Sequence, residues 1–404
     1  LAAGMALYPA LFAWCLRALP APGPRARLLV GAPALWIFAE ALRGWIGTGF
    51  PWLALGYSQI DGPLAGYAPV AGVAACSWAV MICAAAVALA VNAEWRERAL
   101  HVLVVAVVVG AGFGLRGQSW TQVLKGGLDV ALVQGAIPQE TKWDRALRDR
   151  SLAHYLDLTK PYWGASLVIW PETAIPAFPS EVPEMVELLQ STARAEHTTL
   201  LVGMPTGEPW NGRYFNSVVA FGDRPAQYDK RHLVPFGEFF PFKQVLDGFY
   251  RLLSIPLSDF SAGARGQPLI RAGSVLLGVS ICYEDVFGNE VAQGLPAASV
   301  LVNVSNDAWF GDTIAPHQHL EIARMRALET GRNLLRATNT GISAVIDHRG
   351  RVRARAPQFK PTVLHARFVA RAGSTPYVRG GDWPLRGVLA LALVAVARKG
   401  RRAV

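Results

Sequence analysis

Several apolar segments in this chain of 404 residues are close to the length of a membrane-spanning helix. A bilayer core needs roughly 20 consecutive apolar residues when they form a helix. Candidate spans are Leu1–Leu19, Leu28–Leu42, Ala65–Val91, Ala99–Leu115 and Pro384–Ala397. A mean hydropathy of +0.26 with only 17% charged residues agrees with a chain that lies partly in lipid. We therefore expect a transmembrane helical bundle in residues 1–115 and a carboxy-terminal transmembrane helix at 384–397.

The two outermost segments each have a second interpretation. Leu1–Leu19 is also typical of a cleaved signal peptide, but three more apolar segments follow it, which favours a bundle. Pro384–Ala397 is short enough for a core helix, although the basic residues after it favour a span. Because the chain opens with Leu1 and has no basic n-region, we expect a fragment whose earlier spans are missing.

Basic residues flank the apolar segments unevenly. They occur after the first segment, between the third and fourth, and at the chain's end: Arg17, Arg25, Arg27, Arg96, Arg98, Arg398, Lys399, Arg401 and Arg402. By the positive-inside rule these places are cytoplasmic, so residues 116–383 are expected on the opposite side. Anionic lipid head groups near these flanks account for much of the net charge of +10, and we expect no nucleic-acid partner.

Residues 128–369 alternate between short β-branched runs and polar helical patterns, which is typical of one α/β domain. Expected strands are Asp129–Gln134, Ser166–Trp170, Thr199–Gly203, Ser217–Phe221, Val275–Cys282, Ser299–Val304 and Ile342–Asp347. Expected helices are Asp144–Leu158, Glu181–Glu196 and His319–Arg332. A domain of this length is within the ordinary size range.

Reactive side chains follow extended segments of this domain. Glu172 and Cys282 come directly after expected strands, and Lys230 follows an extended stretch. An isolated buried cysteine is usually an inert small hydrophobe, and only its pKa and access make it reactive. Cys282 is the one cysteine outside the apolar segments, so an internal disulfide in this domain is excluded. Chemistry in α/β sheets collects where strands end, which favours Glu172, Lys230 and Cys282 as a catalytic set.

A free thiol has a pKa of about 8.5 and needs a base or a cation to react at neutral pH. Glu172 fits the base if burial raises its pKa. Lys230 fits the group that favours the thiolate and holds an oxyanion, together with the backbone N–H of Tyr283. A histidine base is the rival arrangement, because His232 shares a face with Lys230 on an extended chain.

A metal site is not expected. The one pair with ligand spacing, His317 and His319, has no further ligand nearby in the sequence. We expect no metal and no other cofactor.

Three segments, Trp170–Glu172, Lys230–Glu238 and Ile281–Glu284, resemble the Glu, Lys and Cys boxes of the nitrilase (carbon–nitrogen hydrolase) superfamily. Within it, Gly49–Trp52, Val304–Gly311 and the apolar flanks resemble the apolipoprotein N-acyltransferase family, over nearly the whole chain. The resemblance implies an α/β fold, a four-layer αββα nitrilase-like sandwich fused to a helical transmembrane bundle. It also implies a multi-pass protein of the bacterial inner membrane with its catalytic domain on the periplasmic side.

The same resemblance implies roles for individual residues. Glu172 is the general base, Lys230 the oxyanion stabiliser and Cys282 the acylated nucleophile. Supporting positions are Glu238, which positions the site, Glu284 and Tyr283 beside the nucleophile, and Trp143 near the acyl thioester. Ordinary roles as loop acids or as a core aromatic compete with the supporting assignments of Glu238, Glu284 and Trp143.

The implied reaction has two lipid substrates. A phospholipid acyl donor, phosphatidylethanolamine by the resemblance, acylates Cys282, and the amine of a diacylglyceryl-cysteine in an apolipoprotein then accepts the acyl group. The aromatic segment 236–257 is interpreted as an arm that dips toward membrane lipid, with core packing as the alternative. A membrane-anchored amidase with water as acceptor, and an inactive lipoprotein-binding scaffold, are the rival functions.

Overall fold

The computed structural model describes residues 2–208, 210, 212–239 and 259–402. The chain forms two compact units. One contains residues 1–121, 328–331 and 373–404, and the other contains residues 122–327 and 332–372.

The second unit is built on two six-stranded sheets. The first sheet has the order β12-β1-β2-β3-β4-β5, in which β1, β2 and β3 are parallel and β3, β4 and β5 are antiparallel. Its strands are β1 (Thr121–Gln134), β2 (Leu167–Ile169), β3 (Thr199–Glu208), β4 (Arg213–Phe221), β5 (Ala226–Asp229) and β12 (Thr362–Gly373). The paired parts of the parallel strands, Val130–Leu132 of β1, Leu167–Ile169 of β2 and Thr199–Leu201 of β3, are mostly apolar and buried because both of their faces are covered.

The second sheet has the order β11-β10-β9-β8-β7-β6, again with a parallel centre, β7-β8-β9, and antiparallel edges. Its strands are β6 (Ile270–Ala272), β7 (Val275–Ile281), β8 (Val300–Ser305), β9 (Leu334–Thr338), β10 (Ala344–Ile346) and β11 (Val352–Arg355). Carboxyl ends of parallel strands meet at one edge of each sheet, so the residues that follow β2, β7 and β8 are candidates for a shared site.

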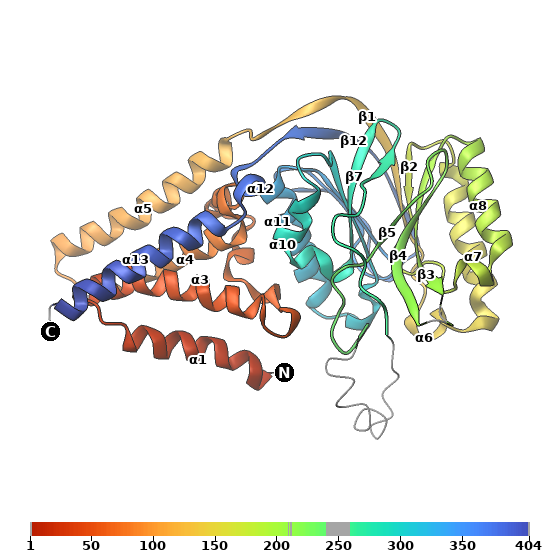
Figure 1. The fold of residues 1–404 in the computed structure, drawn as a ribbon. Coiled ribbons are helices and arrows are strands. Elements are labelled where there is room, and N and C mark those ends of the chain that lie inside the picture. The colour runs from red at the N-terminus through yellow and green to blue at the C-terminus, as the bar shows by residue number, and fades with distance from the viewer. Residues whose placement is uncertain (1, 209, 211, 240–258, 403–404) are drawn as a thin grey trace, which may run out of the picture. The chain divides into compact units, whose positions relative to one another are not determined.

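The two sheets pack face to face, and helices cover their outer faces (Figure 1). Val130 and Leu132 of β1 point into the core between the sheets, whereas Ala131 and Val133 pack against the helices. This alternation is the two-residue period of a strand. The first sheet is covered by α7 (Arg145–Thr159) and α8 (Pro183–Ala195), and the second by α11 (Ala315–Thr330). The predicted four-layer αββα sandwich is confirmed.

The structure has strands that were not among the expected ones, namely β6, β9, β11 and β12, and the extended stretch expected before Lys230 is the strand β5. The helix expected to run to Arg332 ends at Thr330, and β9 begins at Leu334. Gly331 has φ +64°, a left-handed conformation that terminates helices. A short apolar strand directly behind a helix carries no periodicity of its own, so the helix pattern concealed it.

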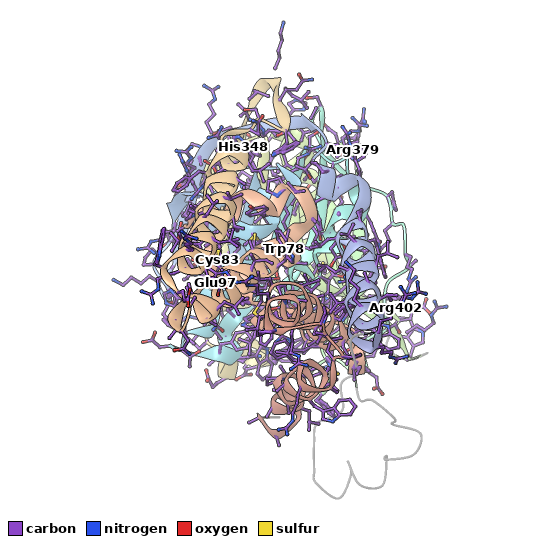
Figure 2. The ribbon with its side chains drawn as sticks, turned by 90° about the vertical axis from the view of Figure 1, so that its left-hand side faces the viewer. Trp78, Cys83, Glu97, His348, Arg379 and Arg402 are labelled. Carbon is purple, nitrogen blue, oxygen red and sulfur yellow. The ribbon has the colours of Figure 1, made fainter. Side chains whose placement is uncertain are left out.

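The first unit is helical. Its helices are α1 (Ala2–Ala18), α2 (Pro24–Ala26), a π-helical turn (Arg27–Gly31), α3 (Ala32–Arg43), α4 (Ala68–Val91), α5 (Trp95–Gly117), α12 (Pro376–Gly380) and α13 (Trp383–Arg402). Trp78 of α4, which is labelled in Figure 2, packs against two apolar clusters. One cluster joins residues of α3, α4 and α13, and the other joins residues of α4 and α5.

Two segments of the described chain are long and apolar enough to cross a membrane, Pro63–Val91 and Trp95–Gly117. Helix α1 is apolar but has only 17 residues. Large apolar side chains of α5, such as Val102, Val107 and Phe113, are exposed. In water such a surface would be costly, whereas lipid chains accommodate it. These two helices indicate anchoring in a membrane.

Candidate active site

Glu172 lies in a tight turn directly after β2. Pro171 follows the last residues of the strand, and Thr173 has φ +50°, an uncommon conformation for a residue with a side chain. Gly203 of β3 lies against this turn, and a Cβ there would be 2.3 Å from the carbonyl oxygen of Pro171. A glycine at position 203 is therefore required for β3 to pass beside the turn that carries Glu172.

Lys230 follows β5, where its backbone N–H donates to the carbonyl of Asn216 on the neighbouring strand at 2.8 Å. The lysine is buried, and its Nζ lies 2.9 Å from Glu238 Oε1 and 3.4 Å from Glu172 Oε1. Asn216 Nδ2 donates to both of these carboxylates at 2.8 Å. One ammonium and one amide thus hold Glu172 and Glu238 together.

Cys282 directly follows β7 of the second sheet and begins a 3-10 turn, Cys282–Val286. Its φ is +50°, a left-handed conformation that costs energy in a residue with a side chain. Asn303 Nδ2 on β8 donates to its carbonyl oxygen at 3.2 Å and helps to fix this turn. Strain of this kind is found where a side chain must be presented in one orientation. Cys282 as a whole residue is intermediate between buried and exposed.

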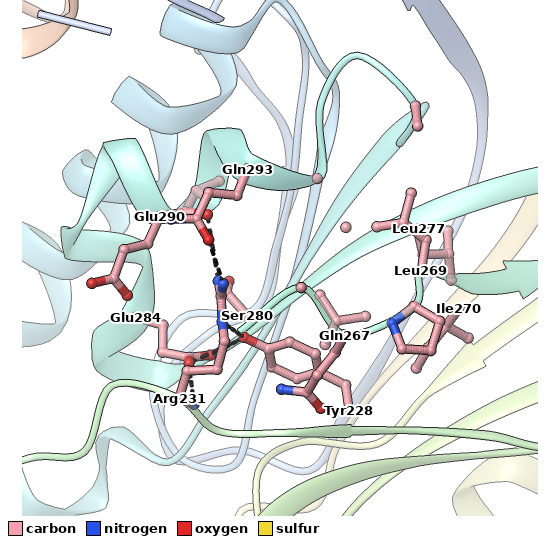
Figure 3. A pocket seen from close by; sticks show the side chains of 17 residues that line it. Tyr228, Arg231, Gln267, Leu269, Ile270, Leu277, Ser280, Glu284, Glu290 and Gln293 are labelled. Carbon is pink, nitrogen blue, oxygen red and sulfur yellow. Dashed lines mark hydrogen bonds between the residues drawn. The ribbon is translucent and has the colours of Figure 1, made fainter. Parts of the chain in front are cut away.

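Glu284 joins the segment of Cys282 to the segment of Lys230. Its buried carboxylate accepts hydrogen bonds from the backbone N–H groups of Ile281 at 2.7 Å, Arg231 at 2.7 Å and His232 at 3.2 Å. The hydroxyl of Tyr228 also donates to it (Figure 3). Glu284 therefore positions two loops.

The region around Glu284 also contains a cavity of 270 Å³. It is lined by residues that include Tyr228, Arg231 and Glu284, and Figure 3 shows Arg231 bonded to Gln293 across it. Glu172, Lys230 and Cys282 do not line this cavity.

The charges at the site act on one another. Burial would raise the pKa of Glu172, but Lys230, Asn216, Lys142 and the N–H of Asn306 outweigh it and lower that pKa. A pKa raised by burial was the condition under which Glu172 was expected to act as the base, and that condition is not met. The carboxylate is instead ionised and able to accept a proton. Burial would lower the pKa of Lys230, but Glu238 and Glu172 raise it well above the ordinary value.

The thiol of Cys282 rests in its protonated form. Burial and the negative charge of Glu172 raise its pKa, against the opposing effect of Lys230. Glu172 and Lys230 are thus both close enough to Cys282 to act on its charge. A neutral thiol beside an ionised carboxylate and an ammonium is an arrangement in which the carboxylate removes the proton during attack.

The other predicted residues occupy different surroundings. Tyr283 is buried, whereas Trp143 is 52% exposed at the end of α6 (Gln139–Lys142) and is not a core residue. His232 Nδ1 lies 3.0 Å from Glu290 Oε1 and its ring stacks on Phe287. Among the described residues His232 has no hydrogen bond to Glu172 or Cys282, so the structure does not support it as the base.

Sequence reasoning missed two residues at the site, Asn216 and Lys142. Asn216 is a polar residue of β4 between Phe215 and Ser217, one position before the expected strand Ser217–Phe221. Lys142 is buried, with its Nζ 3.1 Å from the carbonyl oxygen of Glu172. Nothing in its sequence surroundings distinguishes it from a solvated helix lysine.

His319 lies in a separate buried cluster. Its Nε2 is 2.9 Å from Asp285 and its Nδ1 is 3.0 Å from Asp307, and Arg336 contacts both carboxylates. Within the described parts of the chain, no group of three or more His, Cys, Asp and Glu side chains could hold a metal ion. The predicted arm at 236–257 falls largely on residues 240–258, which lie outside the described residues.

Family models match both parts of the chain. A carbon–nitrogen hydrolase model matches residues 129–377, and a model described as the apolipoprotein N-acyltransferase N-terminal domain matches residues 1–86. The first covers the two-sheet sandwich that carries Glu172, Lys230 and Cys282.

Curated relatives match nearly the whole chain. The apolipoprotein N-acyltransferase of Methylococcus capsulatus is 44% identical over 99% of this chain and 80% of its own length. That of Nitrosomonas europaea is 44% identical over 100% and 81%, and that of Vibrio cholerae is 43% identical over 94% and 77%.

Two solved structures match about two thirds of the chain. A carbon–nitrogen hydrolase superfamily protein of Xanthomonas campestris is 19% identical, with a TM-score of 0.44, over 66% of this chain and 97% of its own. A carbon–nitrogen hydrolase of Helicobacter pylori is 16% identical, with a TM-score of 0.46, over 66% and 92%.

Proposed function

Because the chain belongs to the apolipoprotein N-acyltransferase family of the carbon–nitrogen hydrolase superfamily, we propose that Glu172, Lys230 and Cys282 carry out its acyl transfer through a thioester. The observation that carries this proposal is the buried carboxylate of Glu172, which Lys230 and Asn216 hold in place and whose charge, like that of Lys230, acts on the thiol of Cys282. A ping-pong route follows, in which two substrates use one nucleophile in turn.

In the first half-reaction, Glu172 accepts the proton of Cys282 as Sγ attacks the ester carbonyl of a phospholipid. The ammonium of Lys230 and the backbone N–H of Tyr283 stabilise the negative oxygen of the tetrahedral intermediate. The ester C–O bond breaks, and Glu172 returns the proton to the leaving oxygen. The products are a lysophospholipid and an acyl thioester on Cys282.

In the second half-reaction, the amine of diacylglyceryl-cysteine at the start of an apolipoprotein attacks the thioester carbonyl. Glu172 accepts a proton from the attacking nitrogen, and the C–S bond breaks as the amide forms. That proton passes to the departing thiolate, which restores the resting thiol. Glu238 supports both steps because it shares Lys230 and Asn216 with Glu172. We place Trp143 beside the acyl chain because its exposed indole follows α6.

A membrane location suits substrates that are both lipids. We assign residues 1–115 and 384–397 to the membrane and residues 128–369 to the catalytic domain. The clustered arginines after α1 and between α4 and α5, with the basic end of α13, favour a periplasmic catalytic domain at the bacterial inner membrane.

The test uses the full chain in detergent-lipid micelles with a phosphatidylethanolamine labelled in its acyl chains. A peptide that begins with diacylglyceryl-cysteine is the acceptor, and the same peptide with an acetylated amine is the control. We expect label on the free-amine peptide only. Release of free fatty acid at equal rates with both peptides would instead identify a hydrolase with water as acceptor.

A further inference from the structure

A second lysine lies at the site, and the reaction described above does not use it. We propose that Lys142 is a positioning residue for thioester formation, which fixes Glu172 and balances the negative charge as the proton leaves Cys282. This inference rests on the proposed function of Glu172 and Cys282. It assigns a role to a residue other than Glu172, Lys230 and Cys282.

Helix α6 is attached to Glu172 at both ends. At its last residue, Lys142 Nζ donates to the backbone carbonyl of Glu172 at 3.1 Å. At its first residue, Gln139 Oε1 accepts from Asn306 Nδ2 at 2.9 Å, and the backbone N–H of Asn306 donates to Glu172 Oε2 at 2.7 Å. Through these contacts α6 fixes both the backbone and the carboxylate of the proposed base.

The burial of Lys142 requires an explanation. Its exposed fraction is 3%, and lysine is almost never fully buried unless it is paired. An ammonium carries three N–H donors, and within the described residues its Nζ has one hydrogen bond, to an uncharged carbonyl. A surface lysine would serve equally well as a simple helix end, so its position inside the site indicates an electrostatic role.

The charge of Lys142 acts on both ends of the proton transfer. Burial lowers its pKa to about 8, while Glu172 and the thiol of Cys282 act in the opposite direction. By reciprocity, the ammonium stabilises the negative charge on Glu172 before the proton moves and on Cys282 afterwards. Lys230 differs, because its Nζ is already bonded to Glu238 and Glu172.

The alternative is that Lys142 only holds the structure together. Its replacement would then cause the same loss of stability but a different pH profile of thioester formation. Glu172 faces four groups that lower its pKa, namely Lys230, Asn216, Lys142 and the backbone N–H of Asn306. Removal of the Lys142 charge raises that pKa, so the acid limb of thioester formation moves to higher pH. A purely structural residue would change the rate or the melting temperature without moving that limb.

The experiment compares Lys142→Met, Lys142→Arg and Lys160→Met in the full chain, with thioester formation from labelled phospholipid measured between pH 3 and pH 9. Lys160 is an exposed lysine of the same domain and serves as the matched control. We expect Lys142→Met to slow acylation about 10- to 100-fold and to move its acid limb upward. Lys142→Arg should keep the limb at its wild-type position, because the charge is retained.

Two results overturn the inference. One is an acylation rate of Lys142→Met that lies within about twofold of the rate of Lys160→Met, with the acid limb at the same pH in both variants. The other is a slower but unshifted profile in protein whose melting temperature has fallen. Cys282→Ala separates these results from failure of the proposed function, because label on that variant would contradict the thioester itself.

Discussion

Two clusters of buried charge in the same sandwich have opposite chemical characters. We call Glu172, Lys230, Glu238 and Cys282 the reactive cluster, and Asp285, Asp307, His319 and Arg336 the closed cluster. In the closed cluster, two cations lie between two carboxylates, and each carboxylate binds both of them. All four side chains are at most 1% exposed.

The protonation states separate the clusters. Burial lowers the pKa of His319, but Asp285 and Asp307 raise it to about 9, so the closed cluster has two positive and two negative charges at neutral pH. The reactive cluster instead sets an ionised base beside a neutral thiol. Paired charges hold a structure together, whereas a proton that can still move supports a reaction.

The largest expected effect is on the cation of the reactive cluster. Lys230→Met keeps the length of the side chain but removes the charge that stabilises the oxyanion, so thioester formation should fall about 10³-fold or more. Labelled phospholipid and Lys160→Met provide the assay and its control. Acylation at the normal rate would exclude Lys230 from the chemistry.

Glu172→Gln tests the base with less disturbance of the packing. The amide keeps the shape of the carboxylate but cannot accept the thiol proton, and general-base catalysis contributes about 10²–10⁴-fold. We expect acylation to fall within that range, with a small change in melting temperature. A fully active variant would show that another group removes the proton.

The closed cluster should respond in stability. Arg336→Met leaves Asp285 and Asp307 buried with His319 as their remaining cation, and breaking a buried pair costs about 3–5 kcal/mol. Arg145→Met is the matched control, since this 86% exposed arginine pairs with Glu181 at the surface, where a pair contributes about 0–1 kcal/mol. Thermal unfolding in detergent gives the melting temperature of both variants. Equal decreases in melting temperature would show that the closed cluster stabilises the fold no more than the exposed pair does.

The pH dependence of unfolding gives the smallest of these effects. Because the folded pKa of His319 is raised to about 9 from an ordinary 6.5, its contribution is complete below pH 6.5 and is lost as pH rises through 9. The loss amounts to about 3 kcal/mol. Melting temperatures at pH 6 and pH 9.5 should therefore differ more for wild type than for His319→Gln. Parallel changes in the two proteins would contradict a charged His319.

The residues of the reactive cluster could be proposed from the sequence because each of Glu172, Lys230 and Cys282 directly follows an extended segment. β-branched runs end at Glu172 and Cys282, and strand ends are where α/β sheets place their chemistry. Lys142 could not be predicted from the sequence, because its burial depends on contacts with the loop after β2. The partners of His319 could not be predicted either, because Asp285 and Asp307 lie in two other loops that only the folded sheet brings together.

The pKa of Glu172 shows the same limit. Burial alone raises the pKa of a carboxyl group, and from sequence such a rise was the condition for Glu172 to act as the base. The lowered value depends on Lys230, Asn216, Lys142 and the N–H of Asn306, whose distances from the carboxylate are set by the packing of the strands and loops. The direction of a pKa shift depends on the charged and hydrogen-bonding groups nearby, and the tertiary structure decides which groups these are.

The central claim is that Cys282 carries the acyl group, and the intact mass of the protein tests it most directly. Full-length protein would be incubated with phospholipid without acceptor peptide, beside Cys282→Ala. We predict one added fatty acyl mass on the wild type, located at Cys282 and removed by hydroxylamine, with none on the variant. An unmodified wild-type mass while transfer to acceptor peptide proceeds, or an adduct of equal yield on Cys282→Ala, would contradict the account.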